Sequence, residues 1–201
     1  MTNFLFENQF VLLVVVAFVI LFLAIWGIVR RKKTLNGKAE NGDEFKLISP
    51  AIPSDIPRIR LGDSIRFSST ENPERFLKGG WSSQEPEHRW TEGPKASMVM
   101  AVDGGAGLGH DLLLRLNAYG YLGGGLSHQV VDFIINGQPV TTRQIAEENW
   151  HEVRIPAILG TSGLLYISFH ISNPTAPNEV SESEDGRKLG IAVKEVCILA
   201  T

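Results

Sequence analysis

The sequence is short of cysteine, of clustered positive charge and of catalytic signatures. Cys197 is the only cysteine among 201 residues, which excludes a scaffold built on disulfides. After residue 33 the chain has 15 Lys and Arg against 21 Asp and Glu. Nucleic-acid binding is therefore not expected, because phosphate contacts need clustered positive charge. The five histidines lack H-x-H or H-E-x-x-H spacing and no G-x-S-x-G motif is present, so we predict no metal, no cofactor and no catalytic residue.

One long apolar run stands apart from the otherwise polar chain. Residues 10–29 are twenty in a row without a charged or polar side chain. As a helix rising about 1.5 Å per residue they would span about 30 Å, the hydrocarbon thickness of a bilayer. A cleavable signal peptide would begin with basic residues and have a shorter apolar run, whereas residues 1–9 contain no Lys or Arg. We therefore expect a short N-terminal tail over 1–9 and one transmembrane α-helix over 10–29.

The flank of this run predicts an orientation. Residues 30–33 are Arg-Arg-Lys-Lys, and the positive-inside rule places such a basic flank in the cytoplasm. The expectation is a single-pass protein of the inner (plasma) membrane with its C-terminal domain in the cytoplasm, a periplasmic or extracellular domain being the alternative. Residues 30–57 form a basic stop-transfer flank and a linker rich in Gly, Asn, Pro and acidic residues, which predicts a flexible tether.

Residues 58–201 have the pattern of an all-β domain. Apolar residues alternate over several short segments, helical periodicity is scarce, and Asn136-Gly137 between two such segments is a strong hairpin signal. The predicted fold is an antiparallel β-sandwich of jelly-roll type, preceded by the transmembrane helix. The predicted strands are 59–67 (one strand or a hairpin), 96–102, 111–119, 131–135, 150–155, 164–172 and 191–199, and single helical turns are predicted at 72–77 and 142–148.

The densest chemistry lies in residues 79–93, which hold two Trp, three acidic residues, an Arg and a His. Flat aromatic rings cover the C–H face of a sugar, and carboxylate or guanidinium groups hydrogen-bond its hydroxyls. A long acidic loop, residues 173–190, is expected to meet this segment if both lie at one edge of the sheets. The candidate ligand-binding residues are Trp81, Glu85, Glu87, Arg89, Trp90, Asp185 and Arg187.

A purely structural interpretation of the same residues stays open. Trp81 and Trp90 would then be core anchors, and Arg89 would only form an ion pair with Glu85 or Asp185. In the last predicted strand, Cys197 is expected to pack as a small apolar side chain.

Four stretches are distributed over residues 65–200: GGWSSQEPEHRWTEGPKASM, FIINGQPV, ISFHISNPTAP and SEDGRKLGIAVKEVCI. Their order resembles a β-sandwich accessory module at the C-terminus of bacterial membrane glycosyltransferases and phosphoglycerol-transferase-like enzymes. His88 stands where the family pattern has a Gly. The resemblance implies a setting in cell-envelope glycan assembly, with the module here on a single membrane anchor and without the family's catalytic parts.

The leading hypothesis is a membrane-anchored, non-catalytic module that binds carbohydrate or a glycan-assembly enzyme. Its expected partners are the lipid bilayer, a glycan ligand and a membrane glycosyltransferase. The first alternative is a scaffold subunit of a membrane complex that binds no sugar itself. The second is an enzyme acting on an envelope glycan, with Glu85, Glu87 or Asp185 as acid and base groups.

Overall fold

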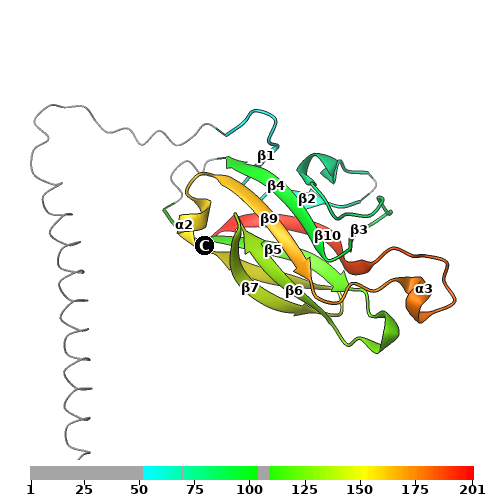
Figure 1. Ribbon diagram of the computed structural model, residues 1–201. Coiled ribbons are helices and arrows are strands. Elements are labelled where there is room, and N and C mark those ends of the chain that lie inside the picture. Colours follow the sequence, from blue (N-terminus) through cyan, green and yellow to red (C-terminus); the bar gives the residue numbers. More distant parts are fainter. Residues whose placement is uncertain (1–51, 69, 104–108) are drawn as a thin grey trace, which may run out of the picture. The chain divides into compact units, whose positions relative to one another are not determined.

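The computed structural model describes residues 52–68, 70–103 and 109–201 (Figure 1). The predicted tail, transmembrane helix and most of the linker, residues 1–51, lie outside the described residues. Within the described ranges, no helix combines the length and apolar character that a membrane span requires.

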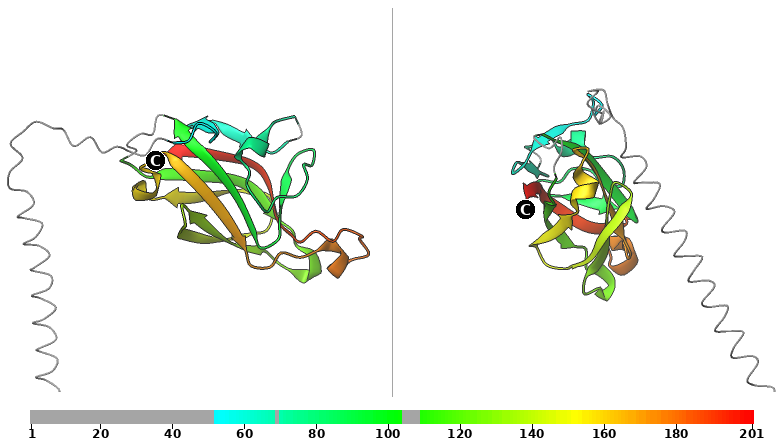
Figure 2. Two further views of the ribbon diagram at one scale, coloured as in Figure 1. Left: turned by 45° about the horizontal axis from the view of Figure 1, so that its top comes forward. Right: turned by 90° about the vertical axis from the view of Figure 1, so that its left-hand side faces the viewer.

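Two sheets pack face to face as a β-sandwich (Figure 1, Figure 2). The first sheet has the order β1 (Arg58–Arg60), β4 (Lys95–Asp103), β9 (Leu164–Ile171), β6 (Gln129–Ile135) and β7 (Gln138–Ile145). The second has the order β2 (Ser64–Arg66), β10 (Leu189–Ala200), β5 (Leu112–Gly120) and β8 (Asn149–Ile155), and β3 (Arg89–Glu92) also pairs with β10. Short helical turns connect them: η1 (Pro73–Phe76), η2 (Gly123–Gly125), α2 (Ala157–Gly160) and α3 (Pro177–Val180).

The predicted sandwich is confirmed, and its connections wrap as in a jelly roll. From β3 to β10 the chain changes sheet at every step except at the β6–β7 hairpin. One pairing differs from the purely antiparallel prediction, because β1 runs parallel to β4 at the edge of the first sheet. The segment 59–67 is therefore not a hairpin, since β1 joins the first sheet and β2 joins the second.

The core lies between the sheets, where the alternating apolar residues meet. In β5 the side chains of Leu112, Leu114 and Leu116 are fully buried while their neighbours face outward. In β9 the corresponding inward residues include Ile167 and Phe169. Because alternate residues of a strand point to opposite faces, this pattern predicted both strands correctly.

The β6–β7 turn confirms the hairpin prediction at Asn136-Gly137. Both residues have positive φ, 50° and 80°, which is what a tight two-residue turn of this type requires and what Asn and Gly tolerate. The Asn136 side chain also fastens the turn to β9, because its Nδ2 donates to the carbonyl of Leu164 and its Oδ1 accepts from the amide of Tyr166.

The predicted helical turn at 142–148 is wrong, because β7 continues to Ile145. This strand lies at a sheet edge with most of its side chains exposed, so the apolar alternation that marks a strand is missing. The other predicted turn, at 72–77, is confirmed as η1.

A β-bulge in β10 changes which residues of the last strand face the core. Val193 pairs with Ala118 and Glu195 with Asn117, so Lys194 is one residue too many on this strand. Val193 and then Val196 are buried, so the core-facing residues of this strand are three positions apart here and not two. A bulge commonly redirects a side chain, and here it turns Lys194 away from the core.

Candidate functional site

Trp81 lies at the start of the 79–93 segment and packs against the core. Its ring centroid is 5.4 Å from that of Phe67 and 5.9 Å from that of Phe169. Its indole Nε1 donates a hydrogen bond of 2.8 Å to the carbonyl of Ser97 in β4. The ring and the polar atom of Trp81 are thus both engaged by the protein itself.

Arg89 is buried at the start of β3 and fastens the segment to η1. Its Nε donates 2.6 Å to the carbonyl of Ser82, and its guanidinium forms an ion pair with Glu74. Its partners are neither Glu85 nor Asp185, which were the partners that the structural interpretation expected.

Trp90 belongs to an aromatic cluster on the outer face of the second sheet. Its ring lies edge-on to Tyr119 at 5.3 Å and to His88 at 5.4 Å. Trp90 and Tyr119 come from strands on either side of β10, where Ala192 pairs with both. The small side chain of Ala192 lets the two rings meet above it, so Trp90 supports the ring of Tyr119 from the side.

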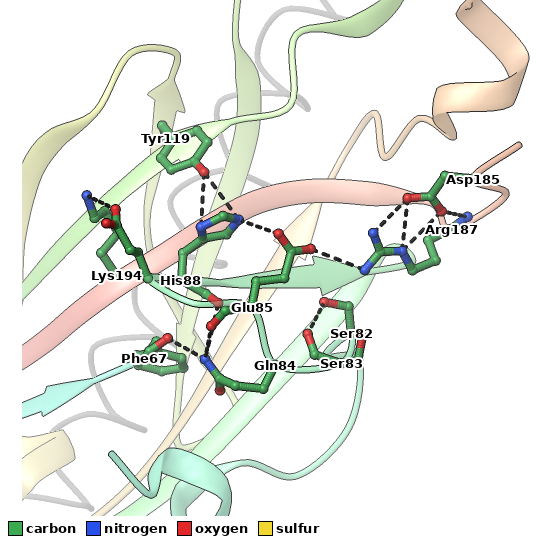
Figure 3. A network of polar contacts seen from close by, with 11 residues as sticks. Phe67, Ser82, Ser83, Gln84, Glu85, His88, Tyr119, Asp185, Arg187 and Lys194 are labelled. Atoms are coloured by element: carbon green, nitrogen blue, oxygen red, sulfur yellow. Dashed lines mark hydrogen bonds and ion pairs between the residues drawn. The ribbon is translucent and has the colours of Figure 1, made fainter. Parts of the chain in front are cut away.

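A chain of polar contacts joins the two candidate segments (Figure 3). The Tyr119 hydroxyl lies 3.3 Å from the His88 ring, and His88 Nε2 lies 3.1 Å from Glu85. Glu85 in turn lies 3.4 Å from Arg187, which binds Asp185 through several contacts of 2.7 to 3.1 Å. The structure therefore brings together Glu85, Asp185 and Arg187, one from the 79–93 segment and two from the 173–190 loop.

The contact between Arg187 and Asp185 keeps both side chains charged. The hydrogen bonds from the Arg187 side chain and amide hold the pKa of Asp185 below its usual value. Asp185 in turn raises the pKa of Arg187, and Glu85 adds to this. The two residues are thus an ion pair at all physiological pH values.

An open groove of about 730 Å³ lies beside the end of β5, where the connection between β7 and β8 passes. Tyr119 and Leu122 supply apolar surface, and Glu87 and His88 form one side. The residues that bring the remaining charges to the groove are Glu147, Glu148 and Lys194. Of the seven candidate residues from the sequence, Glu87 is the one that lines this groove.

Most of the charged side chains that line the groove are negative. Lys194 lies 3.2 Å from Glu148 and 3.7 Å from Glu87, so one ammonium group faces three carboxylates including Glu147. Burial raises the pKa of Tyr119, and the charges of Glu85, Glu148 and Glu87 raise it further. The Tyr119 hydroxyl therefore stays protonated and lies in a field that opposes added negative charge.

Sequence reasoning missed most of the groove because its parts come from four separate segments. Tyr119 ends a predicted strand, and Glu147 and Glu148 fall in the wrongly predicted helical turn. The outward direction of Lys194 depends on the bulge in β10. One signal was present: Lys194 and Glu195 are two charged residues in the middle of a strand whose other side chains are apolar. Within the described part of the chain, no group of three or more His, Cys, Asp or Glu is arranged to hold a metal ion.

No protein-family model and no curated protein matches the sequence. Among solved structures, an acetyl xylan esterase from the rumen bacterium Butyrivibrio proteoclasticus is similar over 69% of this chain and 32% of its own, with 10% identity and a TM-score of 0.42. A carbohydrate-binding module, CBM36, in complex with calcium and xylotriose is similar over 68% of this chain and 98% of its own, with 14% identity and a TM-score of 0.36.

A further module, from Clostridium stercorarium in complex with cellobiose, is similar over 73% of this chain and 98% of its own, with 10% identity and a TM-score of 0.37. The matching part of this chain thus spans about a third of the esterase and nearly the full length of both modules. These similarities are too distant to assign the chain to a family.

Proposed function

We propose that the β-sandwich is a non-catalytic module that binds a carbohydrate in the groove beside Tyr119. The observation that carries the proposal is the combination of an aromatic ring with charged groups around one open groove. Such a ring covers the C–H face of a sugar, while carboxylates and an ammonium group bind its hydroxyls. The volume of about 730 Å³ lies in the range of sites for small ligands.

The polar chain behind the groove has a supporting role in this proposal. His88 holds the hydroxyl of Tyr119, and Glu85 with Arg187 holds His88. Because a ring fixed before binding loses little freedom when a ligand arrives, this chain favours affinity. Both Glu85 and Asp185 are engaged by Arg187, which favours a binding role for the site over acid–base catalysis.

Binding is tested with the full chain in a zwitterionic detergent, because maltoside and glucoside detergents are themselves sugars. A glycan array identifies the ligand and isothermal titration measures its affinity. We expect Tyr119→Ala to weaken binding at least tenfold, since it removes the stacking surface. Tyr166→Ala is the matched control, because Tyr166 is a partly exposed tyrosine on the first sheet, away from the groove.

The two variants also define the contrary result. If no glycan binds to the full chain, or if Tyr119→Ala and Tyr166→Ala bind equally well while melting at the wild-type temperature, the groove is not a sugar site. A glycosyltransferase that copurifies with a chain inert to sugars would instead support the scaffold function.

The setting of the module is part of the proposal. We propose that residues 10–29 anchor it in the inner membrane and that it acts on the cytoplasmic side in cell-envelope glycan assembly. The support is in the sequence: the apolar run, the four basic residues after it and the resemblance to glycosyltransferase accessory modules. Protease added to intact spheroplasts should leave the domain uncut; cleavage in the linker would place it outside.

A further inference from the structure

The charge around the groove points to a narrower class of ligand. We infer that the groove prefers a glycan with free amino groups, such as one built from glucosamine, over neutral and acidic glycans. This inference rests on the proposed function, because it concerns the same groove.

The first observation is the number of unmatched carboxylates. Glu87, Glu147 and Glu148 line the groove and Lys194 is the one ammonium group among the residues that line it. Lys194 already lies within 3.7 Å of both Glu87 and Glu148, so its charge is shared between them. Two negative charges remain while the ring of His88, which also lines the groove, is neutral, and one remains when that ring is protonated. A ligand with positive charge balances them in either case.

The second observation concerns Tyr119, whose ring also lines the groove. Burial raises the pKa of its hydroxyl, and the charges of Glu85, Glu148 and Glu87 raise it further. Two of these carboxylates, Glu87 and Glu148, line the same groove as the ring on which a sugar would stack. A tyrosine ring also attracts a cation placed over its face. Ring and carboxylates therefore favour the same substituent, an ammonium group on the sugar ring.

The third observation is the exposure of the carboxylates. The side chains of Glu87 and Glu148 are 77% and 48% exposed, so a bound amine can reach them without displacing protein groups. An acidic sugar would be repelled by the same carboxylates. The groove therefore discriminates between glycans of one shape by their charge.

The test uses three tetrasaccharides with the same β-1,4-linked backbone: cellotetraose, tetra-N-acetylchitotetraose and the fully deacetylated glucosamine tetramer. Titrations with the full chain are made at mildly acidic pH, where the sugar amines are protonated. We expect the glucosamine tetramer to bind about tenfold more tightly than its acetylated partner, equal to about 1.4 kcal/mol. This is the size expected for two exposed ion pairs, and added salt should reduce it.

Three variants separate the charge effect from a change in fold. Glu147→Gln should reduce the affinity ratio between the amino and acetylated tetramers toward one. Lys194→Met should raise that ratio, because it removes the positive charge that competes with the ligand. Glu71→Gln removes an exposed carboxylate that lines a different pocket and should leave the ratio unchanged.

The outcomes distinguish this inference from the proposed function. If neutral glycans bind and the amino tetramer is no better than its acetylated partner, the inference is wrong and the sugar site stands. If the ratio fails to move in opposite directions for Glu147→Gln and Lys194→Met, charge is not the cause and the inference is again wrong. If pentalysine binds while no glycan does, both proposals fail and the groove is a site for a basic peptide.

Discussion

Replacing Trp81 by alanine should unfold the domain more readily without a specific effect on ligand binding. Removing a core Trp or Phe side chain costs about 3–5 kcal/mol. Trp81 is partly buried, but it contacts both Phe67 and Phe169 and donates a hydrogen bond to Ser97. We therefore expect the free energy of unfolding to fall by about 3 kcal/mol. For a domain of this size that lowers the melting temperature by about 6–12 °C.

The measurement is thermal unfolding of the full chain, followed by circular dichroism. The matched control is Trp150→Ala, because Trp150 lies on β8 with 37% of its surface exposed and its ring under Arg115. That variant should lose about 1 kcal/mol or less. Our assignment of Trp81 to the core would be refuted if Trp81→Ala melted like the wild type and had lost glycan binding.

Three further predictions concern single residues. Burial lowers the pKa of His151 and Arg143 lowers it further, so folding favours the neutral imidazole ring. The stability that depends on this neutral ring is complete above about pH 6.5 and is lost as the pH falls. The urea midpoint of His151→Gln should therefore decrease less on acidification than that of the wild type. Cys197 is buried and its thiol pKa is raised, so iodoacetamide should label it slowly in the folded chain and rapidly in urea. Gly80→Ala should lower the free energy of unfolding by at least about 3 kcal/mol in denaturant titrations, because a Cβ there would lie 1.8 Å from the Lys95 carbonyl oxygen at a φ of +79°. The control Gly79→Ala introduces a Cβ with no atom within 4 Å and should lower it by about 1 kcal/mol or less.

The sequence predicted strands well where one face is buried and the other is not. In β5 the buried Leu114 and Leu116 alternate with Arg115 and Asn117, which indicates a strand with one buried face. Edge strand β7 lacks this contrast, and residues such as Arg143 and Gln144 are ordinary in a helix, so its local pattern favoured the wrong element. The bulge itself could not be predicted, because the adjacent charges of Lys194 and Glu195 mark a polar position in the strand but not an extra residue in its pairing with β5.

The site was harder to predict than the fold because its parts meet only through the sheet order. The 173–190 loop was expected to meet the 79–93 segment if both lay at one edge of the sheets, and the structure shows Arg187 of the loop in contact with Glu85 of the segment. The partner of Arg89 could not be inferred, since Glu74 lies in η1 and reaches it only through tertiary packing. Glu147 and Lys194 share the groove because β10 lies beside β5 and the β7–β8 connection passes its end.

The richness of residues 79–93 in aromatic and charged side chains is explained by rigidity more than by ligand contact. Backbone hydrogen bonds from Ser82 to Trp90 and from Glu92 to Gly80 close the segment into a loop. The side chain of Gln84 donates to the carbonyls of Phe67 and His88, so the tip of the loop is fastened from inside. The tip of the loop carries Glu87 and His88, the charged residue and the ring of this segment that line the groove. A loop held this firmly restricts the position of its tip, so a ligand bound as proposed would gain contacts with Glu87 and His88 at a smaller entropic cost of ordering the loop.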